Sequence, residues 1–398
     1  MTNGGLPLGQ IVTEVRNGQF TNASKNVYPL SKLLRSGEET HRELAAEALG
    51  RLAANYPEDV VFCLDEAVTA ATEDSNDSVR GNCMGLVASV SKRYPEKVAM
   101  YTDKVSTGLL DSHETVATNS VETLAYISDI APQGGLNELD EISSLLSSRK
   151  KKVRFHASIV LYNISMEYPE KVTEYIPKYF DILSNSIVDE NVKLALAGII
   201  QNLAEAEPGA VIDRIESIHA SIIETTDYRV RGNLTGALAE LSKHDPETVS
   251  DYANSFGQLL HDTSNYENKL NLSVILYNVV KHNPRIFEQT NMADVLRKIY
   301  DRSESDEIRQ NISLIIREIE DNKNTFNADI MDGLRSDLGD EILNNFKDLA
   351  NSVGEQTIIQ IDSFVDEMKT TNNTNYEITD GSVADIDNPQ KGLNRRNE

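Results

Sequence analysis

Amide side chains recur along this chain at positions that could hold a peptide backbone. In units of 37 to 39 residues, asparagine follows a basic residue by two positions and again by nine. Positions seven apart are separated by about two helical turns, so both sets share one helix face. An amide carries two donors and an acceptor, which match the C=O and N–H groups of an extended peptide. The candidate partner-binding ladder comprises Asn82, Asn119, His156, Asn163, Asn202, Asn233, Asn271, Asn278 and Asn311.

The same amides have a second possible use. Asparagine is a poor residue in the middle of a helix, so its repetition needs a reason. The amides either face a partner, or they bridge neighbouring copies and cap turns inside the protein. The pattern alone leaves both interpretations open.

A short basic segment is the second candidate site. Arg149, Lys150, Lys151, Lys152 and Arg154 fall within six residues of a chain whose net charge is -25. Such a turn could dock an anionic group or an acidic segment of a partner. The alternative is a solvated turn that pairs with acidic neighbours in the same chain. Nucleic acid is not the expected partner, because affinity for it grows with the number of phosphates contacted.

Residues suited to catalysis or metal binding are present without the spacing that such sites need. The histidines are neither paired four residues apart nor clustered with a cysteine. No glycine-rich phosphate loop and no nucleophile beside a recognisable base motif occurs in the sequence. We therefore expect no enzymatic activity, no metal and no cofactor. The seven histidines are His41, His113, His156, His219, His244, His261 and His282.

The sequence indicates a cytoplasmic protein. Cys63 and Cys83 have no framework or ligand spacing, which is typical of reduced, buried thiols. The first 18 residues lack the charged start and apolar run of a signal peptide. No stretch approaches 18 uninterrupted apolar residues, so we expect no membrane-spanning helix.

The elements that position these residues are marked by a regular proline series. A basic residue lies fifteen residues before each proline, except in one copy, where the residue is alanine. We call this position the basic mark. Regular spacing of this kind indicates a repeat architecture, because each copy needs the same chain break. The prolines are Pro57, Pro95, Pro132, Pro169, Pro208, Pro246 and Pro284. The basic marks are Arg42, Arg80, Ala117, Arg154, Lys193, Arg231, Lys269 and Arg309.

Each unit predicts two helices. Pro95 suits the first position of a helix A that runs to about Leu110. A polar turn follows, and helix B begins near Thr115 with apolar residues three, seven and ten positions after the mark. An acid three residues before the mark occurs in five of eight copies and suits the start of helix B.

Two helices per unit, with an acid and then Val-Arg opening the second, resemble the HEAT-repeat family within the armadillo-like solenoids. The resemblance covers residues 28–322. It implies an all-α, right-handed superhelical solenoid of about eight repeats, with the B helices lining the concave face. The family also places an aspartate six residues before the arginine. Here only Asp74 and Asp111 keep that residue, so we expect a discontinuous Asp–Arg ladder.

The two ends depart from the repeat. Residues 1–27 contain a short apolar pattern suited to covering the first copy. Residues 323–369 contain two amphipathic helical patterns that favour docking on the last copy, with dimerisation as the alternative. Residues 370–398 are rich in Asn, Thr, Asp and Gly, which predicts a disordered tail.

These features favour a non-catalytic scaffold or adaptor. Armadillo-type carriers hold peptides with asparagines of their inner helices, and the resemblance implies a concave groove here. The negative charge favours an extended or basic segment of a partner protein. Two alternatives are a nucleic-acid-associated factor using residues 149–154 and a HEAT-containing lyase-like enzyme. The oligomeric state is left open.

Overall fold

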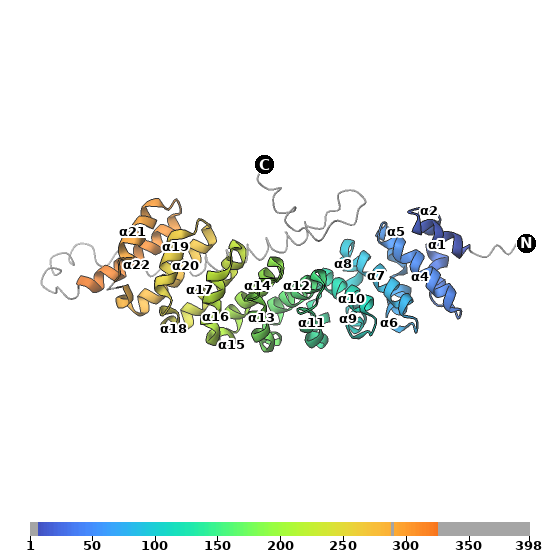
Figure 1. The fold of residues 1–398 in the computed structure, drawn as a ribbon, viewed down its shortest axis with the longest axis horizontal. Helices are drawn as coiled ribbons and strands as arrows, with labels where there is room; N and C mark the ends of the chain where they lie inside the picture. The colour runs from blue at the N-terminus through green and yellow to red at the C-terminus, as the bar shows by residue number, and fades with distance from the viewer. Residues whose placement is uncertain (1–6, 288–289, 325–398) are drawn as a thin grey trace, which may run out of the picture. The chain divides into compact units, whose positions relative to one another are not determined.

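The computed structural model describes residues 7–287 and 290–324, with side chains in the last helix up to Glu320. Every regular element in these ranges is an α or 3-10 helix (Figure 1). Chain contacts define two compact units, whose described parts are residues 7–172 (unit 1) and residues 173–287 and 290–324 (unit 2). The amphipathic patterns and the tail predicted beyond Asn324 lie outside the described residues.

Unit 1 is built from long B helices that pack side by side, α4 on α7, α7 on α10 and α10 on α12. These B helices are α4 (Glu39–Ala53), α7 (Asp77–Arg93), α10 (Glu114–Ile127) and α12 (Lys151–Glu167). The remaining α helices are α1 (Leu8–Arg16), α2 (Thr21–Lys25), α3 (Val27–Leu33), α5 (Pro57–Val60), α6 (Leu64–Glu73), α8 (Pro95–Val98), α9 (Thr102–Thr107) and α11 (Leu139–Leu145). The 3-10 helices are η1 (Val61–Cys63), η2 (Ala99–Tyr101), η3 (Gly108–Leu110), η4 (Pro132–Glu138) and η5 (Pro169–Lys171).

Unit 2 repeats this arrangement, with α14 on α17, α17 on α20 and α20 on α22. Its B helices are α14 (Glu190–Ala206), α17 (Tyr228–His244), α20 (Tyr266–His282) and α22 (Asp306–Asn324). The other elements are η6 (Thr173–Tyr175), α13 (Ile176–Leu183), α15 (Pro208–Val211), η7 (Ile212–Arg214), α16 (Ile215–Glu224), α18 (Pro246–Ser250), α19 (Ala253–Asp262), η8 (Pro284–Phe287) and α21 (Met292–Arg302).

Proline opens the A side of each repeat because the first helical position needs no N–H donor. Pro57 and Pro95 are the first residues of α5 and α8. The predicted continuous helix from Pro95 to about Leu110 is wrong, since α8, η2, α9 and η3 follow one another there. Apolar residues three and four apart fit both α and 3-10 turns, so the pattern does not reveal such breaks.

The apolar positions after each basic mark form the core between the A and B helices. In α17 these positions are Leu234, Leu238 and Leu241, and each side chain is fully buried. Burial of one such side chain contributes roughly 1.5–3 kcal/mol. Because this face of the B helix is fixed in the core, the orientation of the ladder face is fixed with it.

The first helix covers an apolar face of unit 1. Ile11, Val12 and Val15 of α1 are buried, and α1 packs against α4. A repeat at the end of a row has no neighbour on one side, so an additional helix there removes apolar surface from water.

Candidate functional site

One set of ladder amides donates to serine hydroxyl groups of the preceding B helix or its end. Each of these serines donates its own proton to the carbonyl three residues earlier, which leaves its oxygen to accept from the amide. The serines recur four or eleven residues after the basic mark, a signal that the sequence analysis missed. The Nδ2–Oγ distances are 2.7 Å for Asn163–Ser128, 2.9 Å for Asn278–Ser242 and 2.9 Å for Asn311–Ser273.

A second set of amides donates to backbone carbonyls of the preceding B helix. Each accepting carbonyl lies four residues before a glycine, which is Gly85, Gly198 or Gly236. Since Cα–Cβ bonds tilt toward the helix N-terminus, a larger residue there would cover the carbonyl one turn earlier. A Cβ at Gly85 would lie 3.2 Å from the Nδ2 atom of Asn119. The Nδ2–O distances are 3.3 Å for Asn119–Gly81, 3.3 Å for Asn233–Leu194 and 3.2 Å for Asn271–Gly232.

Asn82 has no glycine at the equivalent position of the preceding B helix and forms no hydrogen bond to the described residues of that helix. The equivalent position in α4 is Glu47, and the Nδ2 atom of Asn82 donates within its own helix, 2.9 Å from the Ser78 oxygen. Six ladder amides thus have the bridging geometry that was the alternative interpretation of the pattern. The ladder residues His156, Asn163, Asn233, Asn271 and Asn311 are buried, whereas Asn82, Asn119, Asn202 and Asn278 are half-buried.

His156 occupies a ladder position in α12 without the contacts of an amide. Its ring is 1% exposed, and neither ring nitrogen has a hydrogen-bond partner in the described structure. The ring centre lies 5.8 Å from that of Tyr126 and 5.7 Å from that of Phe155. Burial lowers the pKa of His156 to about 4, because the charged imidazolium loses its hydration. The imidazole is therefore neutral near pH 7.

We expect the ladder bonds to stabilise the repeat stack. Asn271→Ala removes a buried donor that joins α20 to Gly232 and Thr235 of α17. The free energy of unfolding should fall by about 1–2 kcal/mol. Asn82→Ala breaks only a bond within its own helix and should change stability by less than about 0.5 kcal/mol. Urea denaturation followed by circular dichroism compares the two, and equal stabilities would contradict a bridging role.

The basic mark closes the turn between the A and B helices. Arg42, Arg80, Arg154 and Arg231 each donate to the carbonyl of the residue six positions earlier. Carbonyl groups at the end of a helix lack an intrahelical partner, so a guanidinium satisfies them well. The arginine at the mark is thus used inside each of these four repeats.

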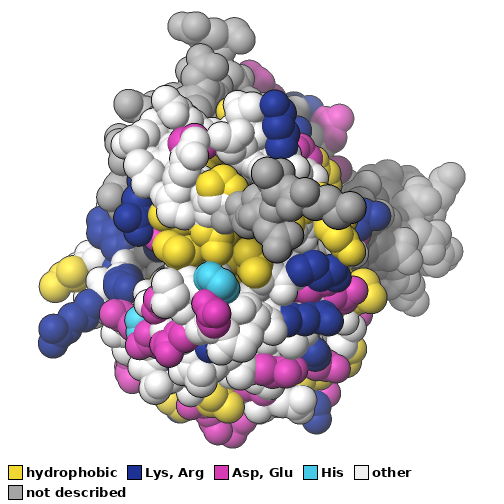
Figure 2. Space-filling view, turned by 90° about the vertical axis from the view of Figure 1, so that its right-hand side faces the viewer, with side chains coloured by type: hydrophobic (Ala, Val, Ile, Leu, Met, Phe, Trp, Pro, Cys, Tyr) yellow, Lys and Arg dark blue, Asp and Glu magenta, His cyan; other side chains and the backbone are white. Residues whose placement is uncertain are grey.

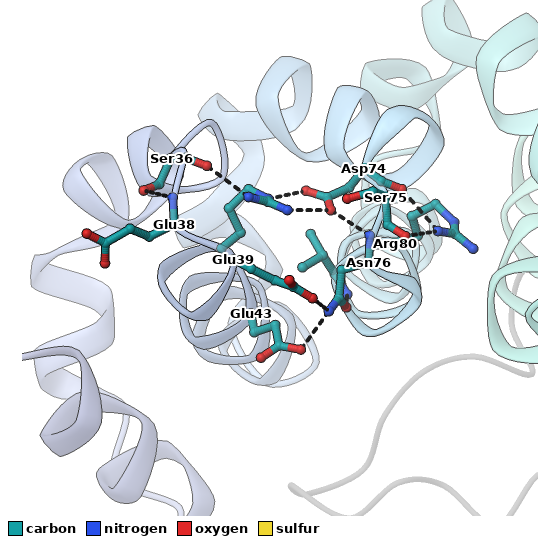
Figure 3. A network of polar contacts seen from close by, with 10 residues as sticks. Ser36, Glu38, Glu39, Glu43, Asp74, Ser75, Asn76 and Arg80 are labelled. Atoms are coloured by element: carbon teal, nitrogen blue, oxygen red, sulfur yellow. Dashed lines mark hydrogen bonds and ion pairs between the residues drawn. The ribbon is translucent and has the colours of Figure 1, made fainter.

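Two of these arginines also bind an aspartate of the next repeat. The Nε atom of Arg42 lies 2.6 Å from Asp74, and that of Arg80 lies 2.6 Å from Asp111. The hydrogen bond from Arg80 lowers the pKa of Asp111. Figure 3 shows the contacts of Asp74 and the bonds from Arg80 to the backbone carbonyls of Asp74 and Ser75. Arg154 forms no ion pair with a described residue, so the Asp–Arg ladder is discontinuous, as predicted.

The basic turn is partly neutralised by the preceding repeat. Lys150 lies 2.9 Å from Glu114, and Lys152 lies 2.7 Å from Glu122, measured between Nζ and Oε1. The side chains of Arg149 and Lys151 are exposed and form no ion pair with a described residue.

The start of α12 also differs from four other B helices. Lys150 precedes α12 without a side-chain cap, and no acid lies in its first turn. Side chains cap the starts of four other B helices, from Asn76, Asp189, Asp227 and Asn265. The turn therefore combines an uncapped helix start with two exposed cations.

Charges are mixed on the end of unit 1 formed by α1, α2 and α4. Figure 2 shows acidic and basic side chains interspersed there, and Arg16 lies 2.6 Å from Glu47. Within the described ranges, no three His, Cys, Asp or Glu side chains are grouped for metal binding. None of the described helices is long and apolar enough to cross a membrane.

The architecture is shared with solved repeat structures. A structure described as "A conserved phosphorylation switch controls the interaction between cadherin and beta-catenin in vitro and in vivo" aligns with a TM-score of 0.58 at 18% identity. The alignment covers 75% of this chain and 63% of that one. A designed armadillo repeat protein in complex with the peptide (KR)4 aligns with a TM-score of 0.45 at 17% identity, over 54% of this chain and 98% of that one. This chain has the armadillo/HEAT-type helical-repeat fold.

Within this fold, one segment resembles a more particular family. Residues 137–205 match the family model of the vacuolar 14 Fab1-binding region. The matched residues include the basic turn and three ladder positions, His156, Asn163 and Asn202. No curated protein matches the sequence.

Proposed function

We propose that this chain is a non-catalytic scaffold that binds a segment of a partner protein along its B helices. The observation that carries the proposal is the match of residues 137–205 to a region named for binding Fab1. The cadherin–beta-catenin structure supports it, because its description concerns an interaction between two proteins. Repeat solenoids suit such a task because stacked copies present one extended surface.

The ladder residues have two proposed roles, bridging and contact with a partner. The six bridging amides, of which Asn119 and Asn278 are half-buried, keep neighbouring B helices in register. The half-buried members, Asn82, Asn119, Asn202 and Asn278, are those that a partner backbone could reach. An extended basic segment is the favoured partner, because the net charge of -25 attracts cations.

A second candidate function is docking of an acidic partner segment at the basic turn. It is favoured by the exposed Arg149 and Lys151 at the uncapped start of α12. Helix starts attract anions, because their N–H groups and the helix dipole point toward the ligand.

One binding experiment separates these two surfaces. The wild-type chain is used to capture a partner from native lysate, the partner is identified and purified, and its Kd is measured for three variants. Asn202→Ala/Asn278→Ala tests the B-helix surface, and Arg149→Glu/Lys151→Glu tests the turn. Arg93→Glu/Lys97→Glu makes the same charge change at exposed sites elsewhere in unit 1.

We expect Asn202→Ala/Asn278→Ala to weaken binding at least about tenfold, and the control to stay within about twofold of wild type. Circular dichroism of each variant must show a folded chain. Loss confined to Arg149→Glu/Lys151→Glu would place the contact at the basic turn. Full binding by all three variants, or chemical conversion of the captured molecule, would contradict the scaffold proposal in this form.

A further inference from the structure

The exposed large apolar side chains of unit 2 gather on one edge. Among its described residues these side chains are Ile187, Ile223, Tyr228, Tyr266 and Tyr300, with exposed fractions of 88%, 50%, 54%, 40% and 40%. All of them lie in or beside the turns that lead from an A helix into a B helix. We call this surface, at residues 184–190, 222–228, 260–267 and 300–307, the A–B edge. Scattered apolar residues are ordinary on a protein surface, but a row of them marks an interaction surface.

The row follows the repeat. Tyr228 and Tyr266 are the first residues of α17 and α20, so they hold the same position in neighbouring repeats. These helices pack together, and the Nδ2 atom of Asn268 donates to the Tyr228 carbonyl at 3.2 Å. The Tyr266 hydroxyl donates to the Glu307 carboxylate at the start of α22. The starts of these two packed helices, which carry Tyr228 and Tyr266, therefore lie roughly 10 Å apart, the distance between packed helices.

The same edge carries exposed carboxylates. Among the positive charges close to it, Arg231 donates to the carbonyls of Ile222 and Thr225, whereas Arg302 is exposed. Arg229 is paired with Asp227 at 2.6 Å. The exposed acids on this edge are Glu190, Glu224, Asp262, Asp301, Glu304 and Asp306.

We propose that the A–B edge of unit 2 binds an extended segment in which basic and apolar side chains alternate. Tyrosine faces attract Lys and Arg through cation–π contact, and the surrounding carboxylates strengthen that attraction. Ile187 and Ile223 offer contacts for the apolar side chains. A segment of about ten residues would follow the starts of four B helices at about 3.3 Å per residue.

Other occupants fit this edge less well. Residues 325–350, which continue the chain beyond the described part, contain six acids against one arginine and one lysine. A second copy of the chain also has a net charge of -25, so its overall field is repulsive. The basic segment from Arg149 to Arg154 of a second copy is the part of the chain that best complements the acidic edge. The experiment must therefore detect self-association.

This surface is separate from the B-helix face of the proposed function, and it would add a second contact to the scaffold. The test is fluorescence anisotropy of the full chain with a labelled ten-residue peptide of alternating Lys and Val. A peptide of alternating Lys and Ser tests whether the apolar side chains are needed. A peptide of alternating Glu and Val tests whether the positive charge is needed. Tyr228→Ser/Tyr266→Ser is compared with Phe62→Ser/Met100→Ser, which removes exposed apolar side chains from unit 1.

We expect the Lys-Val peptide to bind best, and Tyr228→Ser/Tyr266→Ser to weaken it at least about tenfold. Phe62→Ser/Met100→Ser should stay within about twofold of wild type. Equal loss in both variants, unchanged binding by the tyrosine variant, or equal binding of the Lys-Ser peptide would overturn the proposal.

Sedimentation of the wild-type chain alone tests whether a second copy of the chain binds the A–B edge. Self-association that both Arg149→Glu/Lys151→Glu and Tyr228→Ser/Tyr266→Ser abolish would assign the edge to a second copy and overturn the proposal. The Asn202→Ala/Asn278→Ala variant should bind the peptide like wild type, so failure of the B-helix proposal would leave this result intact.

Discussion

Gly134→Ala is expected to lower the free energy of unfolding by about 3 kcal/mol, at the upper end of typical overpacking costs. Gly134 lies in η4, and a Cβ added there would be 1.4 Å from Cγ2 and 2.6 Å from Cβ of Thr102. Rotation about χ1 can move Cγ2 of Thr102 but not its Cβ, so no rotamer of this buried side chain relieves the 2.6 Å contact without moving the backbone. The A sides of two adjacent repeats would have to separate.

Gly209→Ala is the matched control. No atom lies within 4 Å of a Cβ added to Gly209 in α15, and alanine is the better helix former. This variant should be as stable as wild type or more stable by up to about 1 kcal/mol. Urea denaturation monitored by circular dichroism measures both changes. A Gly134→Ala chain with wild-type stability would show that η4 and α9 are not packed as closely as described.

His156→Phe is expected to make the chain less sensitive to acid. The unfolded imidazole has a pKa near 6.5, whereas burial lowers the folded value to about 4, with Glu122 opposing and Lys152 and Lys92 adding to the shift. Between these values the unfolded chain binds more protons than the folded chain, so stability falls as the pH decreases. From pH 7 to pH 5 the loss through this group is about 2 kcal/mol.

The measurement is the free energy of unfolding of wild type and His156→Phe at pH 7 and pH 5. The phenylalanine keeps an aromatic ring beside Tyr126 and cannot titrate. His282→Gln, which changes an exposed imidazole at the end of α20, should retain the wild-type pH dependence. The same acid sensitivity in His156→Phe as in wild type would rule out the buried imidazole as its source.

The repeat fold could be predicted from the sequence because proline marks the positions where helices start, and the regularly spaced apolar residues mark the helix faces that must be buried. Pro57 and Pro95 open helices wherever the chain must restart, and the leucines of α17 must be buried to hold two helices together. The breaks within the A helices could not be predicted, since a 3-10 turn keeps nearly the same apolar face.

The use of the ladder could not be predicted from the amides alone. Periodicity places Asn163 and Asn271 on one face, but a face at the boundary between helices can look toward solvent or toward the next helix. The residues that decide are in the preceding repeat, namely a serine such as Ser128 or a glycine such as Gly236. Pairing each amide position with the positions 38 residues or so upstream would have revealed them.

The ladder also bears on how such a chain can grow. The α17 and α20 copies each carry a donor and an acceptor, Asn233 with Thr235 and Asn271 with Ser273. A duplicated copy of either kind would bring both halves of the bond and could be joined to its neighbours without further change. A gene encoding this protein could therefore gain or lose the α17 or α20 repeat by recombination. The resulting protein would still have hydrogen bonds joining its neighbouring B helices.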